Sequence, residues 1–143
     1  MTDKIKYLED SGAVFLGASN MRALGLANAA FQQMRASVLP KILAEFYMAL
    51  GGAFLGDAIV FPIEDAERPD RRYVLPGIVG ANRALAGAAA LRGKTVWGKN
   101  ALYIFSADAA GNFYMHDILT LSELRKYSDF APALTDCLLV GKI

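Results

Sequence analysis

His116, the only histidine of the chain, stands directly before Asp117 in the run FYMHD. A histidine beside a carboxylate is a pairing that general acid–base chemistry uses. The run itself is rich in aromatic residues and is typical of a strand, in which neighbouring side chains point to opposite faces. His116 and Asp117 are therefore predicted not to form a catalytic dyad with each other. A hydrolase or transferase would need further residues, brought to them from elsewhere in the chain.

Other residue types that carry chemistry lack the surroundings that their chemistry requires. Cys137 lies on the apolar face of the last predicted helix and is typical of a small buried residue. Ser106 and Ser122 do not stand in a nucleophile elbow. The glycines of 51–56 and 98–100 match no phosphate-binding loop, and no HExxH or CxxC spacing is present. The sequence therefore predicts no metal site, no cofactor and no enzymatic activity.

Two residues of the FYMHD run, and Trp97 earlier in the chain, are candidates for binding rather than catalysis. Asp117 shares a strand face with two apolar residues, so we expect a partly buried carboxylate that needs backbone N–H donors or a cation. Trp97 and Tyr114 are aromatic, and such side chains dominate the hot spots of protein interfaces. We therefore expect Trp97, Tyr114 and Asp117 to contribute to a binding surface.

The most charged segment is 64–73, EDAERPDRRY, whose composition favours a solvated loop. Its charges have both signs, and such a patch affects partner choice and association rate more than affinity. Arg71 and Arg72 are the residues of this loop that we expect to contact a partner. The charged residues of the patch are Asp65, Glu67, Arg68, Asp70, Arg71 and Arg72.

The length of 143 residues is typical of a single domain with a substantial core. A net charge of +1 gives no electrostatic case for binding nucleic acid or an anionic membrane. No run approaches the ~18 apolar residues of a membrane span, and 13–16 is too short for a signal-peptide core. One cysteine excludes an internal disulfide. We expect a cytoplasmic protein, and the apolar composition leaves a dimer open.

The elements that must hold these residues begin with helices. Residues 2–10 are predicted as a short helix that stops at Gly12, and Ser19 or Asn20 as the cap of a longer one. Pro40 is predicted to begin the next helix and Gly51-Gly52 to end it with a left-handed cap. The apolar face of the second helix consists of Leu24, Ala27, Phe31, Met34 and Val38.

The later half of the chain is predicted to contain the sheet. Residues 58–61 and 95–98 read as short strands, and 102–118 as a hairpin closed by Asp108 and Gly111. Its first strand is apolar on both faces, which indicates a central position. A helix is predicted over 78–91, whereas 119–127 fits either a strand or a helical turn. The last helix starts at Ser128 or Asp129, and the fold class is α+β with a mostly antiparallel central sheet.

This order of elements resembles the SUKH superfamily, the Smi/Knr-type domains related to a yeast cell-wall-synthesis regulator. The resemblance covers roughly residues 35–120, although Leu50 stands where the family usually has asparagine. It implies one domain with N-terminal helices over 1–38, a core region over 39–120 and a C-terminal helix over 121–143. The residues that match the family motifs are Leu39, Pro40, Phe46, Tyr47, Gly51, Gly52, Gly111, Asn112, Tyr114 and Asp117.

The resemblance also implies what such a domain does. Family members have no known catalytic centre; bacterial members are often immunity proteins that neutralise a toxin, and others are scaffolds. We therefore expect a protein partner, such as a toxin, bound through a concave sheet face. The alternative is a small-molecule or peptide site between the sheet and the alanine-rich helix, around Asn82, Tyr114 and Asp117.

Overall fold

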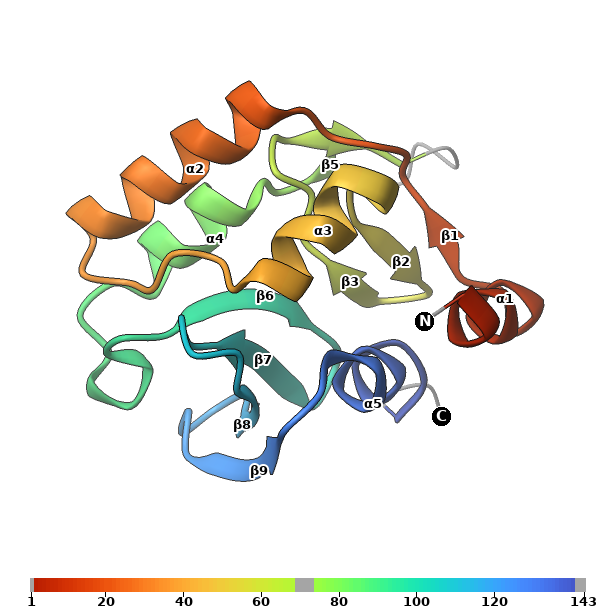
Figure 1. The fold of residues 1–143 in the computed structure, drawn as a ribbon. Coiled ribbons are helices and arrows are strands. Elements are labelled where there is room, and N and C mark those ends of the chain that lie inside the picture. The colour runs from red at the N-terminus through yellow and green to blue at the C-terminus, as the bar shows by residue number, and fades with distance from the viewer. Residues whose placement is uncertain (1, 69–73, 141–143) are drawn as a thin grey trace.

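The computed structural model describes residues 2–68 and 74–140. Its main feature is an antiparallel sheet of seven strands in the spatial order β1-β2-β3-β6-β7-β8-β9. A small second sheet pairs β4 with β5. Figure 1 shows α2 and α4 side by side, with α4 beside the central strand β6, and α5 beside the last strands β8 and β9. The predicted α+β class with an antiparallel central sheet is confirmed.

The strands are short at the N-terminal side of the sheet and reach five residues from β6 onward. They are β1 (Val14–Phe15), β2 (Ala53–Leu55), β3 (Ala58–Val60), β4 (Ala66–Glu67), β5 (Val74–Leu75), β6 (Thr95–Lys99), β7 (Tyr103–Ala107), β8 (Phe113–Asp117) and β9 (Glu123–Tyr127).

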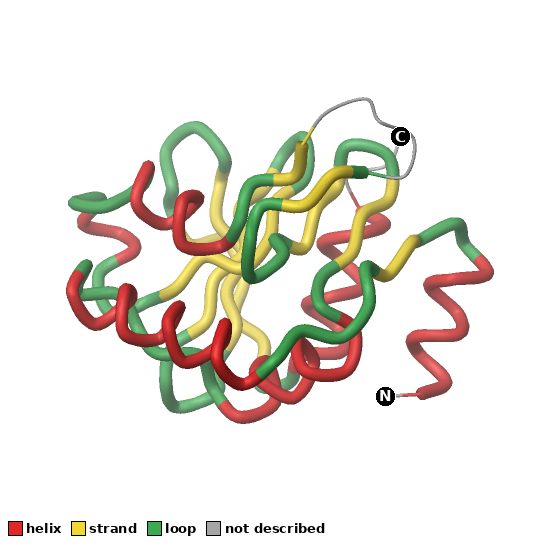
Figure 2. Tube along the Cα trace, turned by 90° about the horizontal axis from the view of Figure 1, so that it is seen from above, coloured by secondary structure: helices red, strands yellow, loops and turns green. Residues whose placement is uncertain are grey.

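The helices precede, interrupt and follow the strands, and Figure 2 shows most of them along one side of the sheet. They are α1 (Thr2–Asp10), α2 (Met21–Gln33), α3 (Lys41–Leu50), α4 (Ile78–Ala84), the 3₁₀ helix η1 (Ala89–Leu91), α5 (Phe130–Thr135) and the π-helical turn η2 (Asp136–Val140).

The start of α2 and both ends of α3 agree with the sequence patterns. Asn20 caps α2 by accepting a hydrogen bond from the Ala23 N–H at 2.8 Å. Pro40 directly precedes α3, and Gly51 ends α3 with φ +73°. Leu24, Ala27 and Phe31 are buried on one face of α2, as predicted. Met34 and Val38, also predicted on this face, lie beyond the end of α2 at Gln33.

The hairpin between β7 and β8 forms as its turn residues predict. The Asp108 carboxylate accepts hydrogen bonds from the N–H groups of Ala110 and Asn112, both at 3.0 Å. Gly111 has φ +92°, which glycine adopts readily. β7 is an interior strand with Ile104 and Phe105 both buried. Local turn chemistry thus accounts for this part of the fold.

Three predicted elements differ in the structure. The helix expected over 78–91 ends at Ala84, because the chain tightens into three-residue turns and Gly87 takes φ +95°. A strand that the sequence analysis did not predict, β2, pairs with β3. The ambiguous segment 119–127 contains β9, which pairs with β8 along its length. In the last two cases the pairing of neighbouring strands decides the conformation, which the pattern of a single segment does not show.

The charged segment 64–73 is not simply a solvated loop. Ala66–Glu67 forms β4, and Arg68 is buried with its guanidinium 4.2 Å from the centre of the Phe54 ring. Arg68 also donates a 2.9 Å hydrogen bond to the Gly56 carbonyl. Arg71 and Arg72 lie outside the described residues. Arg68 therefore belongs to the interior and not to a surface patch.

The core lies between the sheet and the helices α3 and α5. Phe46 of α3 contacts Phe130 of α5 with ring centres 5.2 Å apart. Phe130, Leu134, Cys137 and Leu138 are fully buried, as the periodicity of the last helix predicts. Asp129 caps α5 by accepting a hydrogen bond from the Phe130 N–H at 2.8 Å.

Candidate functional site

The structure places Trp97 in the core and not on a binding surface. Its side chain is fully buried, with the ring centre 5.5 Å from that of Phe105 and 5.2 Å from that of Phe130. The indole N–H has no hydrogen-bond partner among the residues that the structure describes. The expectation that Trp97 contacts a partner is therefore wrong, because the apolar neighbours on both sides of the strand enclose the ring.

His116 is paired with a residue that the sequence analysis did not connect to it. Its Nε2 lies 2.7 Å from the Ser106 Oγ, and its Nδ1 lies 3.0 Å from the Leu121 carbonyl oxygen. Because a carbonyl only accepts, Nδ1 carries the proton and Nε2 accepts from the Ser106 hydroxyl. Both side chains are fully buried. In this arrangement the pair has no access to a substrate and joins β7, β8 and the following turn.

Burial disfavours the charged imidazolium and lowers the pKa of His116 below its ordinary value of 6.5. The charge of Lys94 acts in the same direction, whereas the bond to Leu121 and the charge of Glu123 oppose it. The unfolded chain therefore binds a proton at a pH where the native protein does not. Stability is then complete above about pH 6.5 and decreases as the pH falls below it.

We expect the free energy of unfolding to fall by up to about 1.4 kcal/mol per pH unit below pH 6.5 because of His116. Urea unfolding of the wild type and of His116→Gln at pH 7.5 and 5.5 measures the effect. The variant should lose less stability between the two pH values than the wild type. Equal losses in both proteins would contradict the prediction. The carboxyl groups of Asp108 and Asp117 titrate at lower pH and do not interfere.

Asp117 has the backbone donors that its position predicted. Its Oδ2 accepts hydrogen bonds from the N–H groups of Leu119 at 3.0 Å and Thr120 at 2.8 Å. The Thr120 N–H is the main cause that lowers the pKa of Asp117. Asp117 is partly buried, as its position on the strand predicted. The Asp117 side chain therefore holds the turn between β8 and β9.

Tyr114 belongs to a cluster on the opposite face of the sheet from Trp97. Its hydroxyl donates a 2.7 Å hydrogen bond to Asp108, and Lys94 lies 4.4 Å from the centre of its ring. Lys94 also approaches Glu123 at 3.6 Å. Burial and the bond to Asp108 raise the pKa of Tyr114 to about 12. Tyr114 is 8% exposed, so only its edge is available to a partner.

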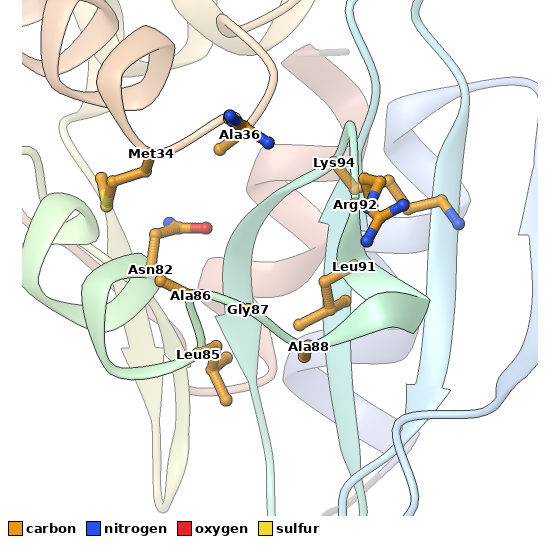
Figure 3. A pocket seen from close by; sticks show the side chains of 11 residues that line it. Met34, Ala36, Asn82, Leu85, Ala86, Gly87, Ala88, Leu91, Arg92 and Lys94 are labelled. Carbon is orange, nitrogen blue, oxygen red and sulfur yellow. The ribbon is translucent and has the colours of Figure 1, made fainter.

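A cavity of about 320 Å³ lies between the C-terminal end of α2, α4 and the segment that follows α4. In Figure 3, Met34 and Asn82 lie on one side of it and Arg92 and Lys94 on the other. Of the three residues expected around a small-molecule site, only Asn82 lines this cavity; Tyr114 and Asp117 do not. Arg35, Arg92 and Lys94 were not predicted, because residues so far apart in sequence have no common pattern.

Three exposed leucines mark a second surface, at the end of the sheet where β7 begins and β8 ends. Leu102, Leu119 and Leu124 are 45%, 89% and 53% exposed, and we call them the leucine surface. The Ile118 N–H donates a 3.1 Å hydrogen bond to the Leu102 carbonyl, which places the backbone of Leu102 beside the turn that contains Leu119. In the sequence, the signal of this surface is the apolar content of the turn DILTLS, where Ile118, Leu119 and Leu121 stand between polar residues.

The strand β9, which contains Leu124, forms an edge of the sheet. Glu123, Arg125 and Lys126 are exposed along it, and the register shift leaves Leu124 as an extra, bulged residue. Arg125 is bound to Asp136 of η2 at 2.8 Å, and Tyr127 also donates to that carboxylate. Charges and a bulge on an edge strand disfavour pairing with another strand. The exposed side chains of this edge, and not its backbone, are therefore suited to contacts.

Cys137 is enclosed beneath the sheet. Its sulfur lies 3.6 Å from the Ile59 carbonyl oxygen, and burial raises the pKa of the thiol. The prediction of a buried small residue is confirmed. Within 2–68 and 74–140, no group of three or more histidine, cysteine or acidic residues is placed to hold a metal ion. In the same residues no helix has the length and hydropathy to cross a membrane.

Neither a protein-family model nor a curated protein matches the chain.

Proposed function

We propose that this chain is a non-enzymatic, cytoplasmic protein-binding module of the immunity or scaffolding kind that the SUKH resemblance implies. The observation that supports it is the leucine surface. Large apolar side chains exposed together and surrounded by polar residues are typical of a binding surface. Leu119, at 89% exposure, makes almost no contact within its own chain.

In this proposal the partner is a different protein, as the SUKH resemblance implies, and not a second copy paired strand to strand. The edge strand beside the leucine surface carries charged side chains and the bulge at Leu124, which oppose edge-to-edge pairing of two copies. The same charges, from Glu123 to Lys126, have both signs. They form a polar rim that favours a partner with complementary charges.

The test uses three variants that carry the same change at exposed leucines. Leu119→Asp and Leu124→Asp lie on the proposed surface, whereas Leu26→Asp, on α2 and 63% exposed, is the control. The tagged proteins are incubated with lysate of the native host, and retained proteins are quantified by mass spectrometry. The retained partner is then purified and its affinity for each variant measured by calorimetry.

We expect one protein to bind the wild type and Leu26→Asp equally, and each surface variant about 30-fold more weakly, because an interface hot spot contributes about 2 kcal/mol or more. If the partner is a toxin, co-expression with the wild type should restore growth of the host, and co-expression with Leu119→Asp should not. Retention of no protein, or equal affinity of all variants, would overturn the proposal.

A further inference from the structure

The cavity beside α4 has the size and lining of a small-ligand site. Its volume of about 320 Å³ lies at the lower end of the range for such sites. Leu85, Ala88 and Leu91 provide apolar contacts, and in Figure 3 they lie together on one side of the opening. This shape arises because α4 ends at Ala84 and the chain turns away at Gly87.

The charged groups around the cavity are all cationic. Arg35, Arg92 and Lys94 line it, and no carboxylate does. Lys94 is already engaged with Glu123 and with the Tyr114 ring. The guanidinium groups of Arg35 and Arg92 have no ion-pair or hydrogen-bond partner in the part of the chain that the structure describes. Two guanidinium groups without partners beside one cavity favour an anion, which each can bind through two parallel hydrogen bonds.

The backbone of Arg35 is a second observation at the same place. Arg35 follows the end of α2 with φ +58°, and the Ala36 N–H donates a 2.9 Å hydrogen bond to the Phe31 carbonyl. This is the helix-ending arrangement in which glycine is the ordinary residue, because a side chain there is strained. Arg35 therefore lines the cavity in a backbone conformation that glycine would adopt at lower cost.

We propose that this cavity binds a small molecule with a phosphate or carboxylate group, which Arg35 and Arg92 neutralise. Leu85, Ala88 and Leu91 contact the uncharged part of the ligand. Asn82 does not bind it, since its amide groups are already occupied by Ile78 and Val96. The inference is independent of the protein partner proposed above.

The experiment measures binding of four probes to the full chain by calorimetry: pyrophosphate, glucose 6-phosphate, citrate and uncharged glucose. Binding of glucose 6-phosphate and pyrophosphate but not citrate identifies a phosphate group as the feature recognised, and the reverse identifies carboxylates. Arg35→Gly and Arg92→Gln are compared with Arg22→Gln, an exposed arginine on α2 that does not line the cavity.

We expect at least one anionic probe to bind, and each cavity variant to weaken it about tenfold or more, as for a lost charge-assisted hydrogen bond. Arg22→Gln should bind like the wild type, and glucose should not bind. Arg35→Gly should melt at or above the wild-type temperature because it removes strain, so its loss of binding would not reflect misfolding. Absence of binding by every anion at millimolar concentration, or equal weakening by Arg22→Gln, would overturn the proposal.

Discussion

Replacement of Gly51 by alanine is expected to destabilise the protein by about 3–5 kcal/mol, the sum of a left-handed backbone and a steric clash. Gly51 has φ +73°, and an alanine Cβ there would lie 1.8 Å from the Gly17 carbonyl oxygen. The clash has no easy relief. The segment before α2 is held against the end of α3 by bonds from the Gly17 N–H to Leu50 and from the Ser19 N–H to Tyr47.

Gly56→Ala is the matched control for this prediction. Gly56 also has a positive φ, +59°, but an added Cβ would meet nothing within 4 Å. Gly56→Ala should therefore lower the free energy of unfolding by only about 1 kcal/mol, the contribution of the backbone conformation alone. Urea unfolding of both variants measures the difference. Equal losses of stability in the two variants would show that the clash between the added Cβ and the Gly17 carbonyl contributes nothing. Backbone strain would then explain the whole effect.

The second large effect is expected for Asn82→Ala, which should lower the free energy of unfolding by about 3 kcal/mol. The buried Asn82 amide donates to the carbonyls of Ile78 and Val96 and accepts from the Val96 N–H, each at 2.8 Å. Alanine would leave both backbone groups of Val96 without these partners at the place where α4 meets β6. An unsatisfied buried polar group is more costly than the mere loss of one hydrogen bond.

Asn28→Ala provides the comparison, because Asn28 makes a single bond of this kind. Its Oδ1 accepts one 3.0 Å hydrogen bond from the Leu39 N–H, and the site is partly exposed. A loss of about 1 kcal/mol is expected there. Urea unfolding ranks the two variants, and hydrogen exchange at the Val96 amide should accelerate only in Asn82→Ala. If the two variants were equally stable, the three-bond arrangement would not be a major support of the fold.

The two proposed sites can be separated by exchanging the variants between the two assays. Leu119→Asp should bind the anionic probe like the wild type, because Leu119 does not line the cavity. Arg92→Gln should retain the protein partner, because the leucine surface lies at the end of the sheet where β8 turns into β9. A variant that lost both activities would indicate damage to the fold and would be detected by its unfolding curve.

Residues whose conformation depends on near neighbours were predicted well. Asp108 and Gly111 close the hairpin through bonds that span only two to four residues. Asn20 caps α2 for the same reason, and the spacing of Leu24, Ala27 and Phe31 determines which face of α2 is buried. Side-chain chemistry and periodicity are sufficient for such features, since all the participating atoms lie within one or two turns of chain.

Residues whose role depends on distant segments were predicted poorly. Trp97 is an aromatic side chain that suits either a core or an interface, and only the position of Phe130 beside it decides between them. Ser106 reaches His116 because β7 and β8 are paired in one particular register. Arg68 is buried because its guanidinium packs against the face of the Phe54 ring in another strand.

By itself, the sequence determined the α+β class, the hairpin, the start of α2, both ends of α3 and the separation of His116 from Asp117 along a strand. Those features follow from local hydrogen bonds and from the alternation of side chains. Only the tertiary structure brought Arg35 and Arg92 to one cavity and exposed Leu102, Leu119 and Leu124 at one end of the sheet. Both sites combine segments whose proximity depends on how the helices pack and how the strands pair, and no local pattern contains that information.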